Sequence, residues 1–313
     1  MKTFWYMNMK QGSDGDDFAE ELWNQDLVGV LFGTWSIGEV ADEHGEPVRE
    51  KVRADTIQRY NPQPRGIDHG RDFNDKFLST SRKFLFNVAV GDRVVVVFDN
   101  TIHLGTIGKE FADDPNPPRG KYQEVLKCRR IESTKSFPLS ELPSSYRLIS
   151  GSGRRAVQKI DTYRAMIELL DSCATSKEVV DSLAGISTSE FLGLISPDQW
   201  ELICDEYLRD KVGLRSLLLD VGRTLKAVDI VGVSDEGNRI LAQCKNDPSF
   251  WKPQRVSDLI DAIPKQLDDE VYFFCRGGVR GDISGLNCTI VDGDEIAAWL
   301  DSDPDYFTRI KTM

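Results

Sequence analysis

Two apolar runs in the C-terminal part of the chain, residues 228–233 and 239–245, have the composition of β-strands. The polar segment between them contains Gly237, and a short polar turn between two such runs predicts a β-hairpin. Side chains alternate between the two faces of a strand, so a hairpin limits which of them can meet. These two strands therefore decide which polar groups of this region lie together.

Pairing the strands about Gly237 sets Asp229 opposite Lys245 and Val231 opposite Gln243. The polar side chains then share one face of the hairpin, near its open end. A carboxylate there can hold a hard divalent cation such as Mg²⁺. A lysine beside it can steady an attacking water or the charge that develops on a phosphate.

The backbone carbonyl of Cys244, between the glutamine and the lysine, offers such a cation a further oxygen ligand. Together these groups match the chemistry of phosphodiester hydrolysis. The alternative is a surface ion pair between Asp229 and Lys245, a pattern that arises often by chance. Spacing alone favours the ion pair, whereas the order of the surrounding elements favours the catalytic interpretation.

That order begins with a well-marked helix start. Ser196 has the N-cap position, Pro197 the first helical position, and Gln199 follows three residues after the cap. The pattern then predicts three strands, a helix and two strands, and it closes with the helical segment 294–303.

This arrangement resembles the Mrr-like branch of the PD-(D/E)xK nuclease superfamily, which has the restriction-endonuclease-like fold. The matching positions are an aromatic–glutamate pair on the leading helix and polar residues on two successive strands: Trp200, Glu201, Asp229, Gln243 and Lys245. The resemblance covers about residues 196–300 and implies an α/β domain with a mixed sheet flanked by helices. It also implies a metal-dependent DNase.

By that resemblance Asp229 is the metal ligand and Lys245 the catalytic lysine, while Gln243 stands where most of the superfamily has a carboxylate. Glu201 on the leading helix can supply the missing negative charge to Mg²⁺ or Mn²⁺, beside the Cys244 carbonyl. No GxxxxGK[ST] loop occurs in the sequence, so we expect no nucleotide cofactor.

The N-terminal part, residues 1–150, has mostly β character, with a hairpin turn predicted at Asp99-Asn100. Its layout resembles the EVE and YTH-like group of the PUA superfamily, and the resemblance implies an α+β domain with a small β-barrel that holds one modified base. The resemblance lies in the opening "FWYM", in "VLFGTWSIG" and in the "GD" turn before residues 93–111. The insert at residues 38–83 departs from the family pattern.

A flipped base needs aromatic faces and groups that read its edge. Trp5, Phe32 and Trp35 are the aromatic candidates, and Ser36 and Asp99 are candidates for reading the edge; the alternative for the tryptophans is barrel core. Basic residues are candidates for phosphate contacts, or else solvated surface charges. They are Arg65, Arg71, Arg82, Lys83, Arg119, Lys121, Arg129 and Arg130.

Charge is unevenly divided along the chain. Residues 1–155 carry 22 Lys and Arg against 23 Asp and Glu, whereas residues 196–313 carry 14 against 22. A polyanion is therefore expected to dock first on the N-terminal part, and the acidic part needs a metal to approach DNA. Scattered cysteines without a CxxC pair, and the lack of a membrane-length apolar run, indicate a cytoplasmic protein without a membrane partner.

We therefore expect three regions: a PUA/EVE-like reader (1–150), a helical linker (151–195) and an Mrr-like nuclease domain (196–313). The expected function is that of a type IV-like restriction endonuclease, which cuts DNA with modified bases in anti-phage defence. Double-strand cleavage would require a homodimer or larger assembly. One alternative is a modified-nucleic-acid binding module with a degenerate nuclease fold. Another is a defence nuclease whose N-terminal domain senses a signal other than DNA.

Overall fold

The computed structural model describes residues 2–9, 17–31, 35–52, 54, 80, 82–113, 125–151, 156–217 and 228–312. The chain divides into two compact units, Met1–Lys177 and Glu178–Met313. The segment predicted as a linker is shared between them, because α6 (Arg164–Ser172) lies in the first unit and α8 (Thr188–Leu194) in the second. Among the described residues, no helix has both the length and the apolar character to cross a bilayer.

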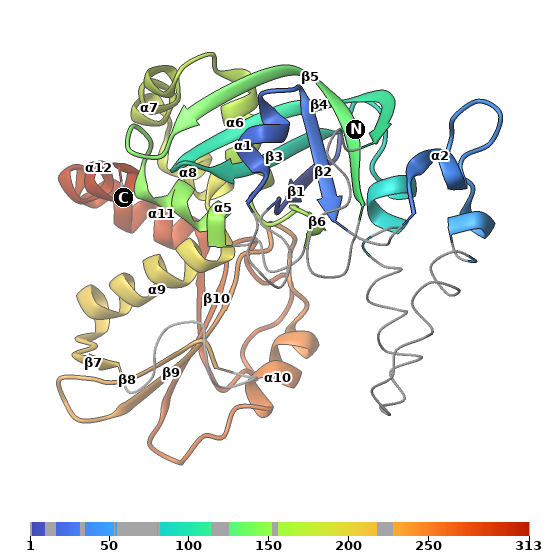
Figure 1. Cartoon of the computed structure of the whole chain (residues 1–313). Coiled ribbons are helices and arrows are strands. Elements are labelled where there is room, and N and C mark those ends of the chain that lie inside the picture. The colour runs from blue at the N-terminus through green and yellow to red at the C-terminus, as the bar shows by residue number, and fades with distance from the viewer. Residues whose placement is uncertain are drawn as a thin grey trace. The chain divides into compact units, whose positions relative to one another are not determined.

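The first unit is built on a six-stranded sheet in the order β2-β5-β4-β3-β1-β6 (Figure 1). Its strands are β1 (Phe4–Met7), β2 (Leu27–Leu31), β3 (Arg93–Phe98), β4 (Thr101–Asp113), β5 (Leu126–Pro138) and β6 (Val157–Lys159). Neighbours are antiparallel except β1 and β3, which are parallel. The strands that the structure describes form an open row between β2 and β6, so the predicted PUA-like barrel is not confirmed.

The β3–β4 turn confirms the hairpin predicted from the sequence. Phe98 pairs with Thr101, and the two residues between them, Asp99 and Asn100, have φ values of 45° and 51°. Two successive left-handed residues form the turn that fits the twist of antiparallel strands, and Asp and Asn tolerate this conformation better than most residues.

The region 151–195, predicted as a helical linker, contains a strand before its helices. Val157 pairs with Met7 and Lys159 with Trp5, so β6 extends the sheet beside β1, and α6 begins only at Arg164. Pairing with β1 satisfies backbone groups of both strands and buries Val157 in the core. Tertiary pairing thus overrides the local helical pattern at the start of this segment.

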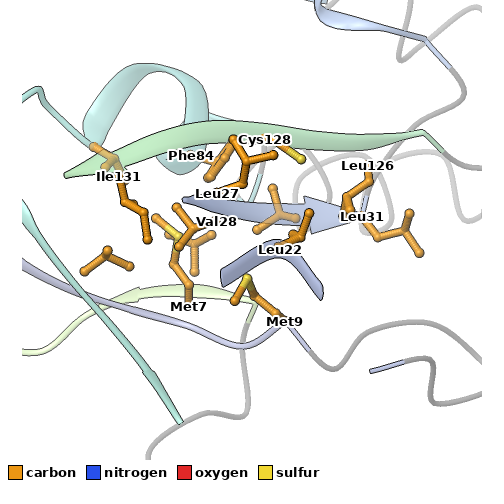
Figure 2. Packing of buried hydrophobic residues seen from close by; sticks show 14 of the residues in the cluster. Met7, Met9, Leu22, Leu27, Val28, Leu31, Phe84, Leu126, Cys128 and Ile131 are labelled. Carbon is orange, nitrogen blue, oxygen red and sulfur yellow. The ribbon is translucent and has the colours of Figure 1, made fainter. Parts of the chain in front are cut away.

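The core of the first unit lies between the sheet and α1 (Ala19–Trp23). Figure 2 shows Met7, Met9 and Leu22 beside Val28 of β2 in this cluster. Gly29 permits the close approach of α1, since a Cβ there would lie 2.9 Å from the Leu22 Cδ1 atom. Shorter helices complete the unit: α2 (Ile37–Val40), the π-helix Lys83–Asn87, the 3-10 helix Ser144–Tyr146 and α5 (Arg147–Gly151).

The second unit has a five-stranded mixed sheet in the order β11-β10-β9-β8-β7. The strands are β7 (Ser216–Leu217), β8 (Ile230–Val233), β9 (Arg239–Lys245), β10 (Glu270–Cys275) and β11 (Thr289–Asp292). The helices are α8, α9 (Pro197–Val212), α10 (Pro253–Asp261), α11 (Gly293–Ser302) and α12 (Pro304–Thr312), and α7 (Ser176–Gly185) spans the division between the units. β10 is parallel to β9 and β11, whereas β8 is antiparallel to both its neighbours.

Helices cover both faces of this sheet. Ile240 and Ala242 of β9 pack in one apolar cluster with residues of α9 and α11, while Leu241 packs in a second cluster with Val256 of α10. Alternate residues of one strand therefore enter different cores. The predicted mixed α/β architecture with flanking helices is confirmed for this unit.

The hairpin register differs from the sequence-based pairing by two residues. Ile230 pairs with Ala242 and Val231 with Leu241, which places Asp229 opposite Gln243 rather than Lys245. The turn is centred on Glu236, because Gly237, with φ of 87°, occupies the last, left-handed position of a three-residue loop. A shift of two residues preserves the faces of a strand, so the predicted grouping of the polar side chains survives.

Candidate active site

Helix α9 begins as predicted and brings Glu201 to the end of the hairpin. The Gln199 backbone N–H donates to the Ser196 Oγ over 3.2 Å, and the Ser196 N–H donates to the Gln199 Oε1 over 3.0 Å. This reciprocal capping box fixes the first turn. Trp200, which is fully buried, anchors the helix on the sheet and leaves the next residue, Glu201, half-buried.

Two hydrogen-bond donors and one ammonium converge on one oxygen of Asp229. The Cys244 backbone N–H donates to its Oδ2 atom over 2.7 Å, the Gln243 side-chain amide also donates to it, and the Lys245 Nζ lies 3.7 Å away. Among the described residues, no donor is recorded on the Oδ1 atom. The carboxylate is thus held by its neighbours on one side, and its second oxygen remains available to a cation.

The Cys244 carbonyl points toward the same side of β9 as the Asp229 carboxylate. The N–H and C=O of one strand residue point in the same direction, and they alternate between the two neighbouring strands. The Lys245 carbonyl accepts the Arg276 N–H of the β10 side over 3.1 Å, whereas the Cys244 N–H points to Asp229 at the start of β8. Backbone alternation therefore directs the Cys244 carbonyl to the side of β9 on which Asp229 lies.

Glu201 has a pKa raised to about 7. Burial is the main cause, and the negative charge of Asp229 adds to it, followed by that of Asp198; the ammonium of Lys245 acts in the opposite direction. Glu201, Asp229 and Lys245 are thus close enough to influence one another. A cation placed between the two carboxylates would favour the ionised form of Glu201.

The available ligands fit a hard divalent cation. Among the described residues, no group of three or more His, Cys, Asp and Glu side chains is placed to hold a metal ion. Mg²⁺ needs fewer protein ligands, because it keeps several waters and binds through one or two carboxylates. Asp229, Glu201 and the Cys244 carbonyl supply such a set.

Asn246, which directly follows Lys245, helps to hold the site together, and it was not identified from the sequence. Its side-chain amide donates to the Ile195 carbonyl over 2.9 Å, which ties the end of β9 to the residue before the α9 cap. The buried thiols of Cys204 on α9 and Cys244 on β9 also hydrogen-bond to each other. In the sequence, the only feature that could have indicated this role of Asn246 is its polar side chain directly after Lys245.

The base-pocket candidates of the first unit lie in several environments. Trp5 is buried in the core, and its indole N–H donates to the Asp92 carboxylate over 2.8 Å. Trp35 is also buried, with the Lys127 ammonium 4.2 Å from the centre of its ring. The remaining candidates are Ser36, which caps α2; Asp99, which lies in the β3–β4 turn; and Phe32, which lies outside the described residues.

The basic residues proposed as phosphate contacts also differ in their exposure and in their partners. The Arg129 guanidinium is buried and donates to the carbonyls of Val88 over 2.5 Å and Gly108 over 3.1 Å. Arg130 is exposed and pairs with Glu110 over 3.2 Å. Arg82 is exposed and Lys83 half-buried, whereas Arg65, Arg71, Arg119 and Lys121 lie outside the described residues.

No model of a known protein family matches the chain, and no curated protein matches it. Among solved structures, a complex of EndoMS with double-stranded DNA is similar at 12% identity and a TM-score of 0.22, over 64% of this chain and 64% of that one. The MspJI restriction endonuclease in complex with a 27-mer oligonucleotide is similar at 11% identity and a TM-score of 0.26, over 80% and 71%.

A repair endonuclease from Pyrococcus abyssi is similar at 7% identity and a TM-score of 0.16, over 68% of this chain and 62% of that one. This chain thus spans slightly less than two thirds of the EndoMS and Pyrococcus chains. At these TM-scores the likeness carries no argument about fold or activity, which therefore rest on the residues of this chain.

Proposed function

We propose that the second unit hydrolyses phosphodiester bonds of DNA with a divalent cation, Mg²⁺ or Mn²⁺, held by Asp229, Glu201 and the Cys244 carbonyl. The observation that carries the proposal is the meeting of two carboxylates and a lysine at one end of the β8–β9 hairpin, where the Cys244 N–H donates to Asp229. A structural ion pair would require neither the half-buried Glu201 nor the constraint on Asp229.

Each residue has a separate task in this proposal. The cation, when bound, supplies Lewis-acid polarisation of the phosphate and a more acidic water. Gln243 and the Cys244 N–H orient Asp229 toward its ligand. The Lys245 ammonium, 3.7 Å from Asp229, stabilises the negative charge that develops on the attacked phosphate.

For the first unit we propose the reading of a modified base, so that the whole chain acts as a modification-dependent restriction endonuclease in anti-phage defence. The support is the sequence layout, and the near-neutral charge of residues 1–155 in contrast to the net negative charge of residues 196–313. A cut of both strands would then require two copies of the chain, since the described residues of each copy supply one such site.

Gln243 favours a second candidate function, that of a nucleic-acid binding module that no longer cleaves DNA. It replaces a negative ligand by a neutral amide that donates to Asp229, so the cation is held by two carboxylates only. Calorimetric titration with Mn²⁺ separates the two candidates. A catalytic site binds Mn²⁺ and loses it in Asp229→Asn, whereas a degenerate site shows no difference between the proteins.

The decisive experiment incubates the protein and Mg²⁺ with matched DNAs that carry unmodified, methylated, hydroxymethylated or glucosylated cytosine. Asp229→Asn and Lys245→Met are compared with Asp235→Asn, which removes a carboxylate from the turn of the same hairpin, where it pairs with exposed Arg215. We expect cleavage of one modified substrate, lost in the first two variants and kept in the third. Cleavage of all four substrates would retain the nuclease and exclude the modified-base reader.

A further inference from the structure

The loops that leave β9 and β10 are joined into one surface beside the candidate active site. The Gly277 N–H donates to the Asp247 carbonyl, the Trp251 N–H to the Gly278 carbonyl and the Arg280 N–H to the Trp251 carbonyl, each over 2.9 Å. Residues 246–252 and 276–281, called here the double loop, are thus tied together by backbone bonds. The double loop directly follows Lys245 and its strand partner Cys275.

Gly277 makes this close pairing possible. A Cβ atom there would lie 2.4 Å from the Ser249 carbonyl oxygen and 2.6 Å from that of Pro248. The two segments therefore meet backbone to backbone, with no side chain between them. Such a pairing holds the side chains of the double loop at defined positions.

Two neighbouring aromatic residues of the double loop point in opposite directions. Trp251 is buried and packs edge to face on Phe273, at 5.6 Å between ring centres. Phe250 is 65% exposed, and the Arg280 guanidinium lies 5.8 Å from the centre of its ring. Trp251 thus anchors the segment and leaves an aromatic ring in solvent with a cation beside it.

The surroundings of Phe250 are basic within an acidic unit. The double loop, residues 246–252 and 276–281, carries three Lys and Arg (Lys252, Arg276 and Arg280) against one acid, Asp247, whereas residues 196–313 carry 14 against 22. Lys252, Arg255 and Arg280 are all exposed. An exposed ring among cations fits a nucleic-acid strand, whose bases stack on aromatic side chains while its phosphates contact Lys and Arg.

We propose that Phe250 stacks an unpaired base of the substrate strand, and that Arg280 and Lys252 hold the adjoining phosphates. This inference rests on the proposed nuclease function, because it places the DNA strand that is cut along the double loop. Phe250 lies five positions after Lys245, so the Cα atoms of the two residues are within about 18 Å of each other. That span corresponds to about five nucleotide steps at 3.4 Å each.

The test measures binding of single-stranded oligonucleotides by the full chain in EDTA, so that no cleavage is needed. A 2-aminopurine base placed at successive positions reports stacking by loss of its fluorescence. We expect Phe250→Ala to weaken binding about 5- to 150-fold, the range of base–aromatic stacking, and to abolish the quenching. Phe250→Trp should keep both, and Leu267→Ala, which removes a fully exposed leucine elsewhere in the unit, should change neither.

Salt dependence separates the two roles. Arg280→Ala should lower the slope of log affinity against log salt by about 0.7, the value for one phosphate contact to a single strand, whereas Phe250→Ala should leave the slope unchanged. Equal affinity and equal quenching in Phe250→Ala and the wild type would overturn this inference, even with cleavage intact. Phe250-dependent binding without any metal-dependent cleavage would overturn the proposed function alone.

Discussion

The Cys244 backbone N–H donates to the Asp229 Oδ2 atom over 2.7 Å, so the strand that carries Lys245 also orients the carboxylate beside it. The position of Asp229 is thus coupled to the main chain of β9 as well as to side chains. Substitution of Asp229 should therefore affect the hairpin itself in addition to any bound cation.

Asp229→Ala should destabilise the second unit by about 1–3 kcal/mol, because it leaves the buried Gln243 amide and the Cys244 N–H without their acceptor. Urea denaturation in EDTA measures this effect apart from the metal. Asp235→Ala, at the exposed turn of the same hairpin, is the control and should change stability much less. Equal stability of the two variants would contradict the structural role of Asp229.

Lys245→Met should lower the rate of DNA cleavage by about 10²–10³-fold, the effect of removing one donor that stabilises developing charge. Metal affinity should fall little, because the lysine is not a ligand. Single-turnover cleavage gives the rate, and Mn²⁺ titration gives the affinity. A parallel loss of both would indicate that Lys245 organises the metal ligands instead.

Glu201→Gln should change how the metal-free protein responds to pH. The folded pKa of about 7 lies above the usual carboxyl value of 4.5, so the folded state binds more protons than the unfolded state between these values. Stability is therefore lost as pH rises from 4.5 to 7 and stays low above it. Urea midpoints in EDTA should show that decline in the wild type and a smaller one in Glu201→Gln.

His103 should make the first unit sensitive to acid. Burial lowers the pKa of its ring from 6.5 to about 4, where it stacks on Phe98 with a centre distance of 3.8 Å. The unfolded state then binds the extra proton between these values, so stability is lost as pH falls from 6.5 toward 4. Titration by NMR should show the low pKa; a His103 signal that titrates near 6.5 would contradict it.

Gly277→Ala should destabilise the protein by about 1–3 kcal/mol, the usual cost of added volume in a packed site. The reason is the backbone contact at 2.4 Å that its Cβ would make with Ser249. Gly285→Ala is the matched control, since nothing lies within 4 Å of that Cβ. Thermal melts of the two variants measure the difference, and similar melting temperatures would contradict the close pairing of the double loop.

Local rules were sufficient for several features of this protein. The capping box at Ser196 and Gln199 predicted the start of α9, because a cap depends on residues three positions apart. The Asp99-Asn100 pair predicted its turn because a two-residue turn also depends only on neighbouring residues. The two-residue period of strands placed Asp229, Gln243 and Lys245 on one face, which holds for any register that differs by an even number of residues.

Only the tertiary structure decided the remaining features. The hairpin register depended on the left-handed conformation of Gly237 at the end of the turn, and residue type alone did not specify it. Residues 157–159 form the strand β6 because they pair with the edge of β1. The pKa of Glu201 is raised because the residue is partly buried near the charge of Asp229. Periodicity assigns side chains to faces, but registers, burial and charge contacts depend on which distant segments pack together.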